Sequence, residues 1–386
     1  MNSASESVSP LDGVRVLDLS RLLAGNMLTV QLADFGADVI KVESAEGDTL
    51  RHWTNDGKPL WWKVYGRNKR SIQLDLKSAA GREALLSLLP ESHVLVESFR
   101  HGAMEAFGLG PEVLHATNPK LVIVRISGWG QTGPYAERPG FGTLVEAFSG
   151  FAARNGFADK PPALPNLGLA DMIAGLSGAF ATLAALREVE ARGGAGQVVD
   201  VSLLDPMIGI LGPDAAVFQH TGKLPRRLGN RAENAAPRGA YLCSDGQWMV
   251  MSGSTQRMAA RVLAAIGRPE LIDDPRFCNN AARVANVEAL DQLIGDFVAN
   301  RSLEDNLSHF GRHEVTVGPV LNVDQLVRDP HVAARQAVVQ FPDPELGQVA
   351  MHNVFPRLSR TPGRIRSAAP TLGQDQSLLD PGGGHR

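Results

Sequence analysis

Over the first third of the chain, short runs of apolar residues alternate with segments in which apolar residues recur at helical spacing. Residues 14–19 form the first run and predict a buried strand, and residues 28–36 follow the helical pattern. Residues 39–43 predict a second strand. A strand, a helix and a second strand in this order are typical of a parallel sheet.

The alternation continues with a helix expected at 79–88 and strands expected at 94–96 and 121–126. Together these segments predict a large α/β domain with a doubly wound, Rossmann-like sheet. Such sheets bind ligands at the carboxyl ends of their strands, so the loops that follow the strands are the expected ligand side of the domain.

An alanine-rich segment from Asp171 to Arg192 has the strongest helical pattern in the chain. Asp171 stands at its start, where unpaired backbone N–H groups and the helix dipole favour an anion. We therefore expect an ionised carboxylate, which could act as an N-cap worth about 1 kcal/mol to the helix or as a reactive group. The segment's apolar residues are spaced like those of a core helix: Ile173, Leu176, Phe180, Leu183 and Leu186.

The pattern changes beyond residue 200. A polar connector precedes an expected β-hairpin at 241–252 that turns at Asp245-Gly246, and helices are expected at 257–266 and 287–298. These elements predict a small α+β domain. The expected division of the chain is a polar leader, the first part of the large domain, the connector with the small domain, and a return to the large domain with a tail: 1–10, 11–221, 222–314 and 315–386.

Composition narrows the function classes. The formal net charge of -3 and the lack of a Lys/Arg-rich run disfavour nucleic-acid binding. The two cysteines, Cys243 and Cys278, form no CxxC pair, which fits a reducing cytoplasm and no disulfide framework. No run of about eighteen apolar residues is evident, so we expect no membrane segment. His309 and His313 have helical spacing but no third ligand, so we expect no metal site.

Short motifs stand in order along nearly the whole chain, at 20–26 (SRLLAGN), 32–43 (LADFGADVIKVE), 68–77 (NKRSIQLDLK), 96–102 (VESFRHG), 127–134 (SGWGQTGP), the helix start at Asp171, 196–200 (GQVVD), 329–331 (DPH) and 369–373 (APTLG). In sequence and in order they resemble the class III CoA-transferase family of the CaiB/BaiF type. Formyl-CoA transferase, carnitine CoA-transferase and α-methylacyl-CoA racemase belong to the same superfamily.

The resemblance implies an enzyme that moves coenzyme A from an acyl-CoA donor, possibly succinyl-CoA, to a carboxylic acid acceptor. In the family, an aspartate at the position of Asp171 forms an aspartyl anhydride and then an aspartyl-CoA thioester. CoA and acyl-CoA would be substrates, with no tightly bound cofactor. The resemblance also implies a homodimer of two interlocked subunits, each with a Rossmann-like large domain and a small domain.

Family positions also imply where coenzyme A would bind. The expected contacts are Leu22, Leu23, Ala24, Ser44, Leu74, Lys77, Ser98, Phe99, Arg100, Gly140 and Phe141. Three positions depart from the usual family pattern, because many members carry an arginine at Ser44, an asparagine at Ser98 and a proline at Asn26. The small domain also lacks the glycine-rich loop of formyl-CoA transferase, and residues 230–239 occupy the comparable stretch.

Three other functions are considered. A dinucleotide-dependent dehydrogenase would need a GxGxxG turn, which is missing after the first strand. A racemase of the same superfamily would place a histidine at Phe141 and a glutamate within 253–256, and phenylalanine cannot transfer a proton. A non-catalytic CoA-binding protein remains an alternative, although the presence of Asp171 argues against it.

Overall fold

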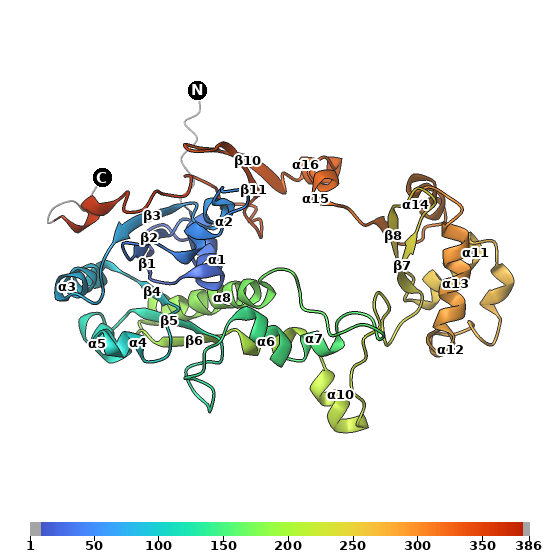
Figure 1. Cartoon of the computed structure of the whole chain (residues 1–386), viewed down its shortest axis with the longest axis horizontal. Coiled ribbons are helices and arrows are strands. Elements are labelled where there is room, and N and C mark those ends of the chain that lie inside the picture. The colour runs from blue at the N-terminus through green and yellow to red at the C-terminus, as the bar shows by residue number, and fades with distance from the viewer. Residues whose placement is uncertain (1–8, 381–386) are drawn as a thin grey trace. The chain divides into compact units, whose positions relative to one another are not determined.

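A computed structural model describes residues 9–380, which form two compact units (Figure 1). Unit 1 contains the described residues up to Phe151, then Leu164–Pro213, and the described residues from Ala333 onward. Unit 2 contains Ala152–Ala163 and Asp214–Val332. Unit 2 thus spans 214–332 where the sequence predicted the connector and small domain at 222–314, and it also takes in 152–163, which the sequence assigned to the large domain. Most of the expected polar leader, residues 1–8, lies outside the described residues.

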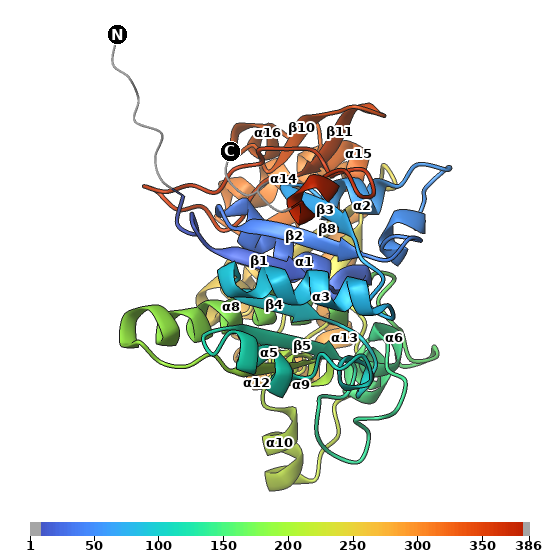
Figure 2. The same cartoon turned by 90° about the vertical axis from the view of Figure 1, so that its left-hand side faces the viewer.

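Unit 1 is built on a six-stranded sheet in which all strand pairs are parallel, in the order β3-β2-β1-β4-β5-β6. Figure 2 shows β3 to β5 one above another, with α3 on the near side. The predicted central parallel sheet of an α/β protein is confirmed. The strands are β1 (Arg15–Asp18), β2 (Asp38–Glu43), β3 (Lys69–Gln73), β4 (Val94–Glu97), β5 (Val122–Ser127) and β6 (Val198–Ser202).

Helices cover both faces of this sheet. On one face, α1 (Leu22–Asp34) and α8 (Leu169–Arg192) bury a shared apolar cluster with the strands. On the other face, α3 (Ala79–Leu88), α4 (Ala103–Ala106) and α5 (Pro111–Thr117) contribute to a second cluster. The remaining elements of unit 1 are η1 (Thr49–His52), α2 (Leu60–Tyr65), η2 (Leu89–Glu91), α6 (Gly142–Phe148), α9 (Leu204–Ile210), the hairpin β10 (Val338–Asp343) and β11 (Gly347–His352), and η4 (Gln376–Leu379).

Unit 2 is a small α+β unit with its own apolar cluster. Strands β7 (Arg238–Leu242) and β8 (Trp248–Ser252) form the predicted antiparallel hairpin, and β9 (Val317–Pro319) completes the sheet. The predicted helices are present as α11 (Gln256–Ala265) and α13 (Val287–Val298). The other elements in or bordering this unit are α7 (Phe151–Arg154), α10 (Asp214–Thr221), η3 (Pro269–Ile272), α12 (Asn280–Ala285), α14 (Leu303–Arg312), α15 (Val323–Leu326) and α16 (Pro330–Ala334).

Helices α1 and α8 approach each other closely because α8 presents glycines at the contact. A Cβ atom at Gly175 would lie 2.7 Å from the Ala24 carbonyl oxygen and 2.7 Å from Cβ of Met27. A Cβ atom at Gly178 would lie 2.7 Å from Cδ1 of Leu28. Only a residue without a side chain permits this distance between the two backbones.

Helix α8 corrects one expectation from the sequence. Among the described residues it is long and apolar enough, by length and composition alone, to cross a membrane, although we expected no such segment. Its buried residues are mostly small, and they pack against α1 and the sheet. Its other side is exposed in the single chain, including Leu176, Phe180 and Leu183, which the sequence predicted to belong to the core.

The α1–α8 contact leads to a prediction for stability. We expect Gly175→Ala to lower the free energy of unfolding by about 1–3 kcal/mol, because the added methyl group overlaps the Ala24 carbonyl oxygen. Gly209 in α9 is the matched control, since a Cβ atom there meets nothing within 4 Å. Gly209→Ala should stabilise the protein by about 0.4–1 kcal/mol. Urea unfolding of both variants tests this, and equal effects would contradict the close contact.

Candidate active site

Asp171 is the third residue of α8, because the helix begins at Leu169 and Gly168 is its N-cap. This corrects the expectation that the helix begins at Asp171, and it removes the N-cap interpretation. The carboxylate lies beside its own backbone N–H and the backbone N–H of Ala24 at the start of α1, and both groups lower its pKa. The first turns of the two helices therefore meet at this side chain.

Two glycines bring main chain close to the Asp171 carboxylate. A Cβ atom at Gly142 would lie 2.3 Å from Oδ2 of Asp171, and one at Gly168 would lie 3.5 Å from the same oxygen. The Gly168 position is also crowded by Leu23, whose Cδ1 would be 2.6 Å away. Any side chain at Gly142 would thus displace the carboxylate.

A second carboxylate, that of Glu146 on α6, lies close to Asp171. Glu146 is buried, and its Oε1 accepts a hydrogen bond of 3.1 Å from the backbone N–H of Ala170. Burial of Asp171, together with the negative charge of Glu146, raises the pKa of Asp171 to about 6. The carboxylate is thus still largely ionised at pH 7. The sequence analysis missed Glu146, although an acidic residue inside the apolar segment 142–148 was a usable signal.

The expected contact residues on the loops after β1 and β4 lie side by side. The backbone N–H of Arg21, which precedes Leu22, Leu23 and Ala24, donates a 2.9 Å hydrogen bond to Oγ of Ser98. Leu23 and Ala24 are buried at the start of α1.

The two residues after Ser98 differ in their surroundings. Phe99 packs edge-on against Phe107 with 6.0 Å between ring centroids, so part of its ring belongs to the core. Arg100 is exposed.

The loops after β2 and β3 carry the next group of expected residues. Oγ of Ser44 donates a 2.8 Å hydrogen bond to Glu46, and the charges of Lys77 and Arg21 lower the pKa of Glu46 further. Lys77 is exposed, whereas Leu74 is buried. Arg21 and Lys77 thus place positive charge near Glu46 and its hydrogen-bond partner Ser44.

Gly140 and Phe141 lead into α6. A Cβ atom at Gly128 would lie 2.7 Å from Cα of Gly140, so the two backbones touch. Phe141 is the N-cap of α6, directly before Gly142, and 61% of its surface is exposed. Its backbone therefore borders the Asp171 carboxylate.

Residues 230–239 make their contacts inside unit 2. Nε of Arg231 donates a 2.7 Å hydrogen bond to Asp291, and the Ala236 carbonyl accepts a 2.7 Å bond from Nε of the buried Arg283. A cleft of about 700 Å³ in unit 2 is lined in part by Arg231 and Asp291. The stretch is thus tied down within its own unit.

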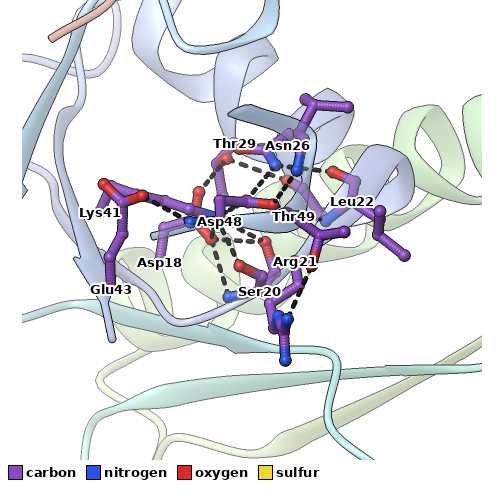
Figure 3. Close-up of polar contacts among 12 residues, drawn as sticks. Asp18, Ser20, Arg21, Leu22, Asn26, Thr29, Lys41, Glu43, Asp48 and Thr49 are labelled. Carbon is purple, nitrogen blue, oxygen red and sulfur yellow. Dashed lines mark hydrogen bonds and ion pairs between the residues drawn. The ribbon is translucent and has the colours of Figure 1, made fainter. Parts of the chain in front are cut away.

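A fully buried charge cluster, which the sequence analysis missed, lies beneath the start of α1 (Figure 3). Nζ of Lys41 lies 3.2 Å from Asp18 and 2.8 Å from Asp48, and Nζ of Lys69 lies 3.2 Å from Asp18. Despite its burial, the two lysines hold the pKa of Asp18 at about 2, and burial lowers the pKa of Lys69 to about 8. These four residues, called the charge cluster below, connect β1, β2, β3 and the loop before η1.

No group of three or more His, Cys, Asp or Glu side chains suited to a metal is present within residues 9–380. His309 and His313 stack on each other with 4.6 Å between ring centroids, and each hydrogen bonds to a backbone carbonyl of unit 2. The His309 imidazole thus joins α14 to the end of α11, whereas that of His313 bonds to the carbonyl of His309 within α14.

Comparison with known proteins identifies what this arrangement resembles. A sequence model described as CoA-transferase family III matches residues 11–376. The chain is 39% identical over 376 residues to succinyl-CoA--D-citramalate CoA-transferase of Chloroflexus aurantiacus, covering 96% of this chain and 93% of the relative. It is 34% identical over 381 residues to succinate--glutarate CoA-transferase of Agrobacterium fabrum, covering 96% and 94%. The crystal structure of a CaiB/BaiF family protein from Brucella suis matches with a TM-score of 0.85 at 34% identity, covering 96% and 98%.

The pair of carboxylates leads to a prediction about titration. We expect the Asp171 carboxyl to titrate near pH 6, and Glu146→Gln to lower this pKa because a neighbouring negative charge is removed. ¹³C NMR of aspartate-labelled protein, with Asp171→Asn to assign the resonance, measures both values. An Asp171 pKa near 4 in the unmodified protein would contradict the desolvated site.

Proposed function

The chain belongs to CoA-transferase family III, and we propose that it transfers coenzyme A from succinyl-CoA to a small dicarboxylic acid through Asp171. The observation that carries the proposal is the position of the Asp171 carboxylate. It lies where the first turns of α1 and α8 meet, with the backbone of Gly142 beside it. A carboxylate with a pKa of about 6 is more basic than an ordinary aspartate and is still largely ionised at neutral pH.

Four steps complete the proposed transfer. The Asp171 carboxylate attacks the thioester carbonyl of the donor, which breaks the C–S bond and yields a mixed anhydride and CoA thiolate. The thiolate attacks the aspartyl carbonyl, so the donor acid leaves and an aspartyl-CoA thioester forms. The acceptor carboxylate attacks this thioester and releases the thiolate again. The thiolate then attacks the acceptor's carbonyl, which regenerates Asp171 and forms the new acyl-CoA.

The substrate class rests on the named relatives. Those named for D-citramalate, L-malate and glutarate all act with succinyl-CoA or succinate, and these acids are all short dicarboxylates. The relative with D-citramalate in its name covers nearly the full length of both chains. We therefore propose a four- or five-carbon dicarboxylate as the acceptor, with D-citramalate as the first to assay.

The other functions considered from the sequence gain no support. The relatives with printed activities are CoA-transferases, and the family is an enzyme family. Phe141, at the position where a racemase would carry a histidine, offers no group that can accept a proton. Transfer through a carboxylate needs no such group at the substrate α-carbon.

The proposal predicts the effect of removing the nucleophile. Asp171→Asn should abolish formation of a new thioester from succinyl-CoA and D-citramalate, followed by mass spectrometry, because an amide cannot form the anhydride. With hydroxylamine present, the unmodified protein should gain a hydroxamate at Asp171 itself. Wild-type turnover by Asp171→Asn, or modification at a different residue, would contradict the proposal.

The same variant carries a control for folding. The folded pKa of Asp171 lies above its unfolded value, so the ionised carboxyl destabilises the folded state above about pH 6, and this cost disappears as pH falls through 4. Asp171→Asn should therefore raise the free energy of unfolding at pH 7, on the order of 1 kcal/mol. Loss of activity with increased stability separates chemistry from misfolding.

We also propose the interlocked homodimer that the family resemblance implies. Leu176, Phe180 and Leu183 follow one another at helical spacing on α8 and are exposed in a single chain, Phe180 at 75%. A stripe of large apolar side chains on the central helix is costly to leave in water, and a second copy of the chain would cover it. Cys243 and Cys278 are both free, which supports a reducing, cytoplasmic location for such a dimer.

The dimer proposal has a direct test. Sedimentation of the unmodified protein should show a dimer down to nanomolar concentration, and Phe180→Glu should prevent its assembly because a charge would be buried. Val113→Glu on α5 is the matched control, since Val113 is also an exposed apolar helix residue but faces away from α8. A folded, active monomer of the unmodified protein would contradict the interlocked arrangement.

A further inference from the structure

Leu22, the first residue of α1, has an unusual backbone conformation. Its φ is 63°, in the left-handed region that a residue with a side chain rarely adopts. Such a conformation costs on the order of 1–2 kcal/mol and persists only where its surroundings enforce it. The strained residue lies two positions before Ala24, whose N–H reaches Asp171.

Two buried side chains hold both backbone polar groups of Leu22 (Figure 3). Its N–H donates a 3.0 Å hydrogen bond to Oδ1 of Asp48, and its carbonyl accepts a 2.6 Å bond from Nδ2 of Asn26. Nδ2 of Asn26 also donates to Oδ2 of Asp48 over 2.7 Å. The three residues thus form a closed ring of hydrogen bonds around the start of the helix.

The charge cluster holds this ring of hydrogen bonds in place. Nζ of Lys69 donates a 2.7 Å hydrogen bond to Oδ1 of Asn26, and Nζ of Lys41 lies 2.8 Å from Oδ2 of Asp48. The side chains of Lys41, Asp48 and Lys69 are fully buried, so water cannot replace these partners when they are lost. Loss of any hydrogen bond in the ring would therefore leave a buried polar group without a partner.

Helix geometry links the backbone conformation of Leu22 to the direction of the Ala24 N–H. The first four N–H groups of a helix have no partner within it, and that of Ala24 is one of them. Its direction is set by the helix axis, which is fixed by Leu22 at the end and by the contact between the Ala24 carbonyl and Gly175 on α8. A change at Leu22 would rotate the first turn and move the Ala24 N–H away from Asp171.

We propose that Asn26 and Asp48 are positioning residues, which hold Leu22 in its left-handed conformation and thereby aim the Ala24 N–H at the Asp171 carboxylate. The inference rests on the proposed role of Asp171 as the nucleophile. Asn26 is the more informative of the two, because its Nδ2 bonds both the Leu22 carbonyl and Asp48 while its Oδ1 accepts from Lys69.

Asn26→Leu tests the proposal, because leucine has a similar volume but removes every side-chain hydrogen bond of Asn26. The Ala24 N–H lowers the pKa of Asp171, so turning this group away from the carboxylate should raise that pKa above about 6, by about 0.5–1. ¹³C NMR of the Asp171 carboxyl measures this without any turnover. Over a titration from pH 4.5 to 7.5, Asp18, with a pKa of about 2, keeps its charge, and Lys69, with a pKa of about 8, begins to lose its proton only near the upper end.

Thr29→Val is the matched control. Oγ1 of Thr29 is buried beside the same charge cluster and donates to Asp18 over 2.6 Å and to the Gly25 carbonyl over 2.9 Å, and neither hydrogen bond involves Leu22. It should lower stability while leaving the Asp171 pKa within about 0.2 of its original value, since only buried hydrogen bonds are lost. Asn26→Ala provides a second variant, in case leucine prevents folding, and should shift the pKa in the same direction.

Kinetics provide a second, separate measurement. Turnover at pH 7 should fall about tenfold in Asn26→Leu, because the carboxylate loses its fixed orientation, while Thr29→Val should stay within about twofold. An unchanged Asp171 pKa in both folded Asn26 variants would overturn the positioning role. That result would leave the nucleophile proposal intact, which fails instead if Asp171→Asn still turns over.

Discussion

The close contact between α1 and α8 is the constraint on which the site depends. Gly175 and Gly178 leave no side chain between the two helices, so the α8 backbone touches Ala24 and lies against Leu28. Because both helices begin at the carboxyl end of the parallel sheet, this contact brings their first turns together as well. Two sets of unpaired N–H groups are thereby directed at one region, and Asp171 is the side chain that occupies it.

The polar interior beneath this contact is unusual for a core. Removing Asp18, Lys41, Asp48 and Lys69 from water carries a large desolvation cost, which their mutual attraction offsets only in good geometry. An apolar cluster of the same volume would hold the strands together at least as well. An apolar cluster could not, however, support the hydrogen bonds that Asp48 and Asn26 make to the N–H and the carbonyl of Leu22. The cluster is therefore better explained by what it orders at the start of α1 than by stability.

The sequence predicted those parts of the fold whose pattern is apolar. The strands at 14–19 and 39–43 and the helix at 79–88 were recognisable because their buried residues are hydrophobic. Strand β3 was missed because its sequence, KRSIQ, is mostly polar, and its buried Lys69 is paired only through residues distant in the chain. The start of α8 was placed two residues late because Gly168, not Asp171, is the N-cap.

The candidate site could be predicted from the sequence only at its centre. Asp171 was identified from its place at a helix start and from the family resemblance, but its environment depends on distant contacts. Glu146 and Ala24 come from segments about 25 and 150 residues away, and no local pattern reveals that their groups meet at one carboxylate. The helix dipole alone favours a low pKa, whereas burial and Glu146 dominate and raise it.

Opposing influences act on the pKa of Asp171, the proposed nucleophile. Burial and the Glu146 charge raise the pKa of the carboxylate, which makes it more basic and thus a better nucleophile. A pKa raised well above 7, however, would leave it protonated and unreactive at neutral pH. The Ala24 N–H acts in the other direction, because it favours the ionised form and lowers the pKa. An acidic neighbour sets the basicity, and an N–H group held by the buried ring around Leu22 limits it. If Asp171 attacks the thioester as proposed, a mobile N–H would give neither a fixed pKa nor a fixed direction of attack, so buried charges that order the first turn of α1 would serve the reaction.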